Sequence, residues 1–128
     1  MKNQVTTIEQ WERLKKSGVP AKKASMCWVK DPNENKYNLV VHDESCYEMA
    51  ALEPIPAYTV ADIIELLPMF IERKGTFYLN ITPCYEGWYA GYETEKGLEL
   101  KSFRGPKLVD VLMAATEWLL SNGYKLNV

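Results

Sequence analysis

Cysteine is scarce in this sequence, and the three residues, Cys27, Cys46 and Cys84, are too few and too widely spaced for a disulfide scaffold. No apolar run approaches the ~20 residues that a membrane-spanning helix needs, and no apolar segment follows the N-terminus as in a secretory signal. An excess of basic charge is also absent, because 15 basic and 17 acidic residues give a net charge of −2. We therefore expect a cytoplasmic protein with no membrane association and no general affinity for phosphate backbones.

Familiar catalytic and metal-binding motifs are missing as well. The sequence has no glycine-rich phosphate loop, no Gly-x-Ser-x-Gly elbow and no Cys-x-x-Cys pair. Its single histidine, His42, has only Cys46 nearby at spacing four, and the acidic pair Glu93 and Glu95 is expected in water at a hairpin tip. We expect no metal, no cofactor and no catalytic residues, although a small enzyme stays open as an alternative.

The composition is that of an ordinary globular domain. The 128 residues include 47% hydrophobic and 25% charged residues, and no internal repeat is visible. This length suits one hydrophobic core, so we expect a single domain over residues 1–128.

The first half predicts a helix and a hairpin. A helix over residues 8–17 follows a capping box formed by Thr6 with Glu9 or by Thr7 with Gln10. Two strand-like runs, 24–30 and 37–42, flank a loop rich in turn-forming residues and predict a hairpin.

The middle of the sequence is less regular. Residues 44–52 fit either a helical turn or an irregular strand, and Pro54 and Pro56 indicate a connection. Thr59 is a suitable N-cap for a further helix, which Pro68 should end or kink. The apolar face of that helix is expected to comprise Ile63, Ile64, Leu66, Leu67 and Phe70.

The second half has clearer patterns. Alternating apolar residues predict strands over 76–82, 88–92 and 98–101, with a turn at 94–97 that ends in glycine. An apolar stripe at helical spacing predicts a last helix over 106–121. The element order is α-β-β-(?)-α-β-β-β-α, which predicts an α+β fold whose antiparallel sheet is packed by helices.

Aromatic residues on neighbouring strands and lysines near the N-terminus are the candidate binding residues. Because successive strand residues point to opposite faces, Trp88 and Tyr89 cannot both contact the last helix. The face turned away is covered by the N-terminal hairpin, or binds a partner, or stacks nucleic-acid bases. The candidates are Tyr78, Trp88, Tyr89 and Tyr92, together with Lys15, Lys16, Lys22 and Lys23.

Charge is distributed unevenly along the chain. Residues 1–30 carry seven basic and two acidic side chains, whereas residues 31–72 carry one basic and nine acidic side chains. The basic segment either faces the acidic middle of the same fold or forms a patch for an acidic partner.

Three stretches support a resemblance to a known group of sequences. They are Thr7–Gln10 with Gly18–Ala21 and Met26–Trp28, Ile55–Thr59 with Leu66–Pro68, and Glu117–Leu120 with Asn122–Tyr124. Their order resembles small open reading frames of prophages and mobile elements of gut bacteria, a family with no assigned activity. The strand-strand-strand-helix order of residues 76–122 is also similar to HicB-type antitoxin domains, and with the preceding helix it resembles the order in double-stranded-RNA-binding domains.

Together these observations favour a non-enzymatic accessory protein that acts by contact with another protein or as a homodimer. A nucleic-acid-associated module is the alternative that the HicB-like order implies. The basic motif that opens the last helix of double-stranded-RNA-binding domains is absent, since only Lys107 lies in that turn.

Overall fold

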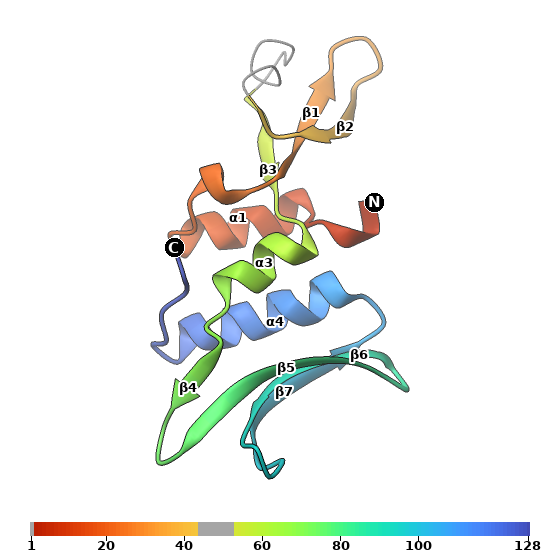
Figure 1. The fold of residues 1–128 in the computed structure, drawn as a ribbon. Coiled ribbons are helices and arrows are strands. Elements are labelled where there is room, and N and C mark those ends of the chain that lie inside the picture. Colours follow the sequence, from red (N-terminus) through yellow and green to blue (C-terminus); the bar gives the residue numbers. More distant parts are fainter. Residues whose placement is uncertain (1, 44–52) are drawn as a thin grey trace. The chain divides into compact units, whose positions relative to one another are not determined.

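The computed structural model describes residues 2–43 and 53–128 and divides the chain into two compact units, Met1–Asp62 and Ile63–Val128 (Figure 1). Each unit is described by itself. The segment 44–52, for which the sequence left a helical turn or an irregular strand open, lies outside the described residues, as does Cys46.

The first unit begins with a capped helix. After the 3-10 turn η1 (Lys2–Gln4), helix α1 spans Ile8–Lys16 and confirms the helix predicted for 8–17. Of the two capping boxes considered, the one at Thr7 forms: the Thr7 hydroxyl accepts from the Gln10 amide at 3.1 Å, and the Gln10 side chain accepts from the Thr7 amide at 2.8 Å. A second 3-10 turn, η2, spans Ala21–Lys23.

The sheet of this unit has the order β2-β1-β3 and is antiparallel. Its strands are β1 (Met26–Asp31), β2 (Lys36–Val41) and β3 (Ile55–Ala57). The β1–β2 pair confirms the predicted hairpin, but the connection expected around Pro54 and Pro56 is wrong in part, because Pro56 lies in β3 opposite Cys27. Proline is tolerated there because β3 is an edge strand.

Tyr58 and Thr6 join distant segments of the first unit. The Thr6 amide donates to the Tyr58 carbonyl at 2.8 Å, and the Thr6 hydroxyl accepts from the Tyr58 amide at 2.9 Å. The Tyr58 ring stacks on Trp11 with centroids 6.1 Å apart, and its hydroxyl donates to the Pro20 carbonyl. Burial is the main cause that raises the pKa of Tyr58 to about 12, and the charge of Asp62 adds to it.

The Asp62 carboxylate makes a second long-range link in the first unit. Its side chain is 8% exposed and accepts from the Ser25 amide at 2.8 Å, the Ser25 hydroxyl at 2.5 Å and the Thr59 amide at 2.9 Å. The Thr59 hydroxyl in turn accepts from the Asp62 amide at 3.1 Å, which completes the predicted cap. One carboxylate therefore joins the start of β1 to the start of the next helix.

That helix, α3, spans Val60–Leu66 and ends before Pro68. The prediction that Phe70 belongs to its apolar face is wrong: Phe70 begins a short strand, β4 (Phe70–Glu72), and is 53% exposed. Proline disfavours the helical conformation in the residue before it, which leaves the following residues available for sheet pairing.

The second unit contains the antiparallel sheet β4-β5-β6-β7. Its longer strands are β5 (Thr76–Cys84), β6 (Gly87–Glu93) and β7 (Glu99–Gly105). They confirm the three predicted strands, although β7 runs further than expected. A register shift at Tyr92 and Glu93 precedes the β6–β7 turn.

The last helix, α4 (Leu108–Ser121), lies across β6 and β7 on one face of this sheet (Figure 1). It starts two residues later than predicted, with Lys107 as N-cap, and Gly123 follows it with a φ of +79°, as a C-terminal glycine should. The predicted stripe is buried at Leu112, Ala115 and Leu119. The α+β class with an antiparallel sheet packed by helices is confirmed.

Within the described residues, no helix is long and apolar enough to cross a membrane.

Candidate functional site

One face of the four-stranded sheet is turned away from α4. An added Cβ on Gly105 would lie 3.3 Å from the Val111 side chain of α4, so the face shared by Gly105 and its partner Trp88 is the helix-covered one. Alternate residues define the opposite face. This open face comprises Phe70, Glu72, Thr76, Tyr78, Asn80, Thr82, Tyr89, Gly91, Glu93, Glu99, Ser102 and Arg104.

A hydrogen-bonded cluster occupies the centre of the open face. The Tyr89 hydroxyl lies 3.0 Å from Oε2 of Glu93 and 3.0 Å from Oε1 of Glu99, and the Asn80 amide donates to Oε1 of Glu93 at 3.0 Å. A phenol carries a single proton, so Tyr89 donates to one carboxylate at a time. Two carboxylates from different strands are thereby held beside one hydroxyl.

Gly91 makes this arrangement possible. Tyr89 and Glu93 lie two residues to either side of Gly91 on the same face of β6. A Cβ on Gly91 would lie 2.8 Å from the Tyr89 hydroxyl oxygen and 2.8 Å from the Lys101 carbonyl. The Tyr89 side chain therefore lies along the strand over a position where only glycine leaves room.

Charge and burial shape the protonation of this cluster. Burial is the main cause that raises the pKa of Tyr89, and its hydrogen bonds to Glu99 and Glu93 raise it further. Hydrogen bonds from Ser102 and Tyr89 lower the pKa of Glu99. The Arg104 guanidinium lies 5.4 Å from the centroid of the Tyr89 ring, which is 7% exposed. The open face is thus neutral at Tyr89 and negatively charged at Glu99 near pH 7.

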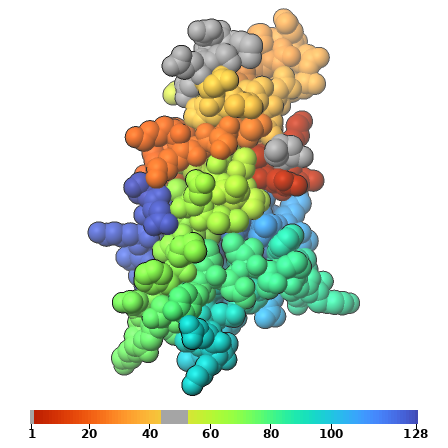
Figure 2. All heavy atoms as spheres, in the orientation of Figure 1, coloured from red at the N-terminus to blue at the C-terminus, as the bar shows by residue number. Residues whose placement is uncertain are grey.

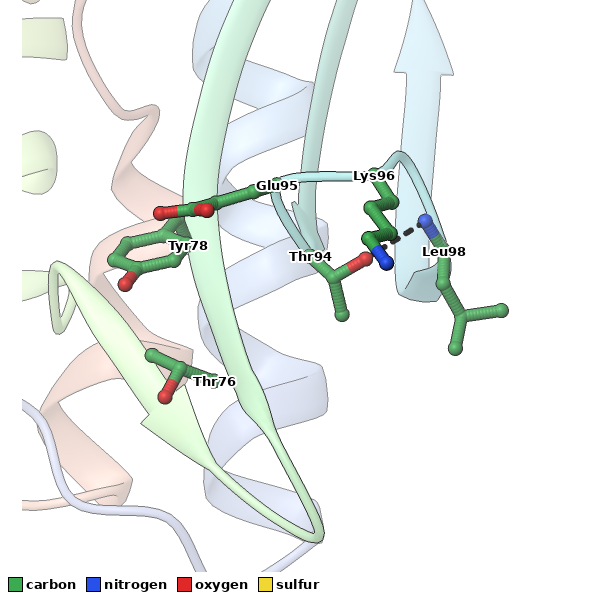
Figure 3. Close-up of a pocket in the computed structure, with 6 residues that line it drawn as sticks. All are labelled: Thr76, Tyr78, Thr94, Glu95, Lys96 and Leu98. Carbon is green, nitrogen blue, oxygen red and sulfur yellow. Dashed lines mark hydrogen bonds between the residues drawn. The ribbon is translucent and has the colours of Figure 1, made fainter.

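Two depressions adjoin the cluster. The Tyr89 depression has a volume of about 460 Å³ and is lined by Asn80, Thr82, Cys84, Glu86, Tyr89, Glu93, Gly97, Glu99 and Arg104. The Tyr78 depression has a volume of about 500 Å³ and is lined by Thr76, Tyr78, Thr94, Glu95, Lys96 and Leu98 (Figure 3). The β6–β7 turn contributes to both, so the two depressions are neighbours.

The Tyr78 depression combines an aromatic ring with charge. Figure 3 shows the Glu95 carboxylate pointing from the turn toward the Tyr78 ring, while Leu98 points away from it. The Thr94 hydroxyl accepts from the Leu98 amide at 3.0 Å and fixes the turn (Figure 3). Tyr78 is 43% exposed, and Phe70, its direct partner on β4, is 53% exposed. In the space-filling view, β4, β5 and this turn reach the surface (Figure 2).

The structure separates the four aromatic candidates. Tyr78 and Tyr89 lie on the open face, Tyr78 at its surface and Tyr89 within the polar cluster. Trp88 and Tyr92 lie on the other face. Tyr92 is 2% exposed and donates its hydroxyl to the Pro68 carbonyl at 2.8 Å, so its ring serves the core.

The four lysine candidates lie in the first unit. Lys15 and Lys16 end α1, Lys22 and Lys23 belong to η2, and all four are exposed. Only five residues separate the two pairs along the chain. We refer to Lys15, Lys16, Lys22 and Lys23 together as the basic corner.

Sequence reasoning missed Phe70, Asn80, Gly91, Glu99 and Arg104 as members of the site. Strand alternation carried a signal for Asn80, since it falls between Tyr78 and Thr82 on one face. Glu99 and Arg104 required the register of β7, and Gly91 required knowledge of the ring that lies over it.

Among the residues that the structure describes, no group of three or more histidine, cysteine, aspartate and glutamate side chains could hold a metal ion. Cys27 is buried and Cys84 is partly buried. The arrangement on the open face is suited to hydrogen bonding, ion pairing and apolar contact.

No protein-family model, curated protein or solved structure matches this chain.

Proposed function

We propose that this chain is a protein-binding module that uses the open face to contact a partner protein, without catalysing a reaction. The observation that carries the proposal is the group of exposed apolar side chains beside the Tyr78 depression: Phe70 is 53%, Tyr78 43% and Leu98 67% exposed. Burying side chains of this kind is a principal source of affinity in protein interfaces.

The magnitude fits a specific but moderate contact. Fully burying a large apolar side chain yields about 1.5–3 kcal/mol, and these three are already partly buried, so each contributes about 1–2 kcal/mol. Association costs several kcal/mol because both proteins lose translational and rotational freedom, so the three apolar side chains need support from polar contacts. The carboxylates beside Tyr89 supply such contacts with little reorganisation, because Asn80 also donates to Glu93 and Ser102 also hydrogen-bonds to Glu99.

The charge of the open face favours a protein over a nucleic acid. The two depressions are lined by four glutamates and by two basic side chains, Lys96 and Arg104. The four glutamates are Glu86, Glu93, Glu95 and Glu99, which gives the lining a net charge of −2. Such a surface repels a phosphate backbone and attracts basic groups.

The proposal also includes the origin of the protein and the compartment in which it binds its partner. We propose that the chain is an accessory protein of a phage or mobile element and acts in the cytoplasm. The Cys84 thiol, which is not in a disulfide, suits that reducing compartment.

Site-specific photo-crosslinking tests the proposal. A benzophenone amino acid replaces Tyr78 in one variant and Tyr85 in the other; Tyr85 is a matched control because it is a fully exposed tyrosine in the β5–β6 turn. We expect a discrete protein adduct from position 78 in cells, with a yield that falls when Phe70→Ser is added. Equal adducts from both positions, or none from position 78, would refute the proposal.

A further inference from the structure

The outer side of β2 is an open edge of the first sheet. β2 ends the strand order β2-β1-β3, and within the described residues its outer side has no partner strand. The His42 amide donates to the Ser25 carbonyl at 2.9 Å, one step beyond the paired residues of β1 and β2. Backbone groups alternate in direction along a strand, so the amides and carbonyls of Tyr37, Leu39 and Val41 point outward, away from β1. The Val41 carbonyl accepts from the Asp43 amide at 3.1 Å and keeps a second lone pair.

This edge lacks the features that protect the other edge strands from pairing. Proteins prevent strands from joining at a sheet edge by short strands, proline, charged side chains and bulges. β3 contains Pro56, β4 has only three residues, and β7 carries Lys101 and Arg104 beside a register shift. β2 has neither a proline nor a register shift, and its one charged residue, Lys36, stands at its first position. Among the strands that the structure describes, β2 is therefore the edge best suited to accept another strand.

The outward residues of β2 also carry an apolar row. Tyr37, Leu39 and Val41 alternate along the strand and share the face of Trp28, because Trp28 is the partner of Leu39 on β1. None of the three side chains in the row is buried, and that of Val41 is 62% exposed. An edge strand with such a row exposes both backbone groups and apolar surface to a partner.

A depression adjoins one end of this row. It has a volume of about 380 Å³ and is lined by Lys2, Thr7, Ile8, Glu9, Trp28 and Tyr37. The Trp28 indole donates to the Thr6 carbonyl at 3.0 Å, which fixes the orientation of this ring. The Tyr37 end of the row therefore offers space for an apolar side chain, whereas the Val41 end offers an exposed apolar side chain.

We propose that β2 pairs with β2 of a second copy of this chain, in antiparallel orientation, so that the two sheets become continuous. Leu39 lies opposite Leu39 of the second copy, and Tyr37 lies opposite Val41 of the second copy. In this register every outward residue of one strand meets an outward residue of the other. A shift by two residues leaves one outward residue of each strand without a partner in β2. The contact lies in the first unit and does not depend on the function proposed for the open face.

The pattern of β2 selects a second copy over other strands. In this register the exposed Val41 side chain comes beside Tyr37 of the second copy, at the depression that adjoins that ring. The two-fold axis repeats this contact, so both exposed valines are covered at once. A second copy also supplies a strand that β1 has already ordered, whereas a disordered peptide loses conformational freedom on pairing.

Sedimentation equilibrium of the purified full chain tests the contact. We expect the wild-type protein to dimerise at about 0.1 mM, with twice the 14.7 kDa monomer mass. Val41→Lys places a charge in the apolar row twice in each dimer, and it should raise the dissociation constant at least about tenfold. Val128→Lys is the matched control, because Val128 is a valine of similar exposure, 64%, in the second unit. A monomeric wild type, or equal weakening by the two substitutions, would overturn the inference.

Photo-crosslinking at position 41 tests the register. A benzophenone amino acid replaces Val41 in the purified protein, and mass spectrometry locates its attachment after irradiation. We expect a covalent dimer attached in the segment around Tyr37 of the second copy, as the antiparallel register requires. Attachment around position 41 of the second copy, or no covalent dimer, contradicts the inference. So does an adduct with a different protein in cells when the purified wild type is monomeric.

Discussion

Replacing Asp62 should destabilise the first unit far more than its position on a short helix suggests. Asp62→Ala removes the acceptor of the Ser25 and Thr59 amides, which lie 2.8 Å and 2.9 Å from the carboxylate. Each partly buried amide left without an acceptor costs about 1–3 kcal/mol, and the Ser25 hydroxyl can turn to water. We expect Asp62→Ala to lower the free energy of unfolding by about 3 kcal/mol.

The asparagine variant separates geometry from simple loss of contact. Oδ2 of Asp62 accepts both amides, and Oδ1 accepts the Ser25 hydroxyl. An asparagine oxygen in the Oδ2 position keeps both amide bonds, and its NH₂ group can donate to the Ser25 hydroxyl once that hydroxyl rotates. Asp62→Asn should therefore cost only about 1 kcal/mol, the difference between charged and neutral acceptors.

Urea unfolding followed by tryptophan fluorescence measures these changes, since Trp11 and Trp28 belong to the same unit as Asp62. Glu65→Ala is the control, because Glu65 is an exposed acidic residue of the same helix and should change stability by less than about 0.5 kcal/mol. Equal losses for the Ala and Asn variants of Asp62, or a loss for Glu65→Ala as large as that for Asp62→Ala, would refute the reasoning.

Three further predictions follow from burial and packing. Leu112→Ala should destabilise the protein by ~2–5 kcal/mol because the Leu112 side chain is fully buried. Lys107 is exposed, so Lys107→Ala should change stability by less than about 0.5 kcal/mol. Comparable shifts in melting temperature for the two variants would contradict the assigned faces of α4. The folded-state pKa of Tyr58, about 12, lies above the ordinary tyrosine value of 10.0. The contribution of Tyr58 to stability is therefore complete below pH 10 and is lost as pH rises toward 12, and Tyr58→Phe should reduce that slope in alkaline unfolding measurements. Gly91→Ala should displace the Tyr89 hydroxyl and lower the free energy of unfolding by about 1–3 kcal/mol. Thermal unfolding measures the loss of stability, and near-UV circular dichroism measures the change around the tyrosine ring. An unchanged tyrosine signal would show that the ring does not lie over Gly91.

The local elements were predictable because their signals lie within a few residues of each other. The capping box at Thr7, the alternation along β5 and the glycine after α4 each depend on neighbouring positions in the chain. The opposite orientation of Trp88 and Tyr89 follows from strand geometry in the same way.

Other features could not be derived from local pattern. Phe70 has the spacing of a helical residue, but pairing with Tyr78 places it in a strand. The Tyr89 cluster depends on Glu99, which reaches the open face through the register of β7 after the shift at Glu93. A register shift of one residue would send a strand's side chains to the opposite face, and no short sequence pattern specifies it.

By itself the sequence determined the fold class, the hairpin of the first unit, most of the strands of the second and the last helix, because hydrophobic periodicity, caps and turn residues act over short distances. Only the tertiary structure decided that Pro56 joins an edge strand, that Tyr58 bonds to Thr6 across 52 positions, and that two glutamates from different strands meet at one hydroxyl. These contacts join segments far apart in the chain, and their formation depends on the packing of whole elements, which neighbouring residues do not encode.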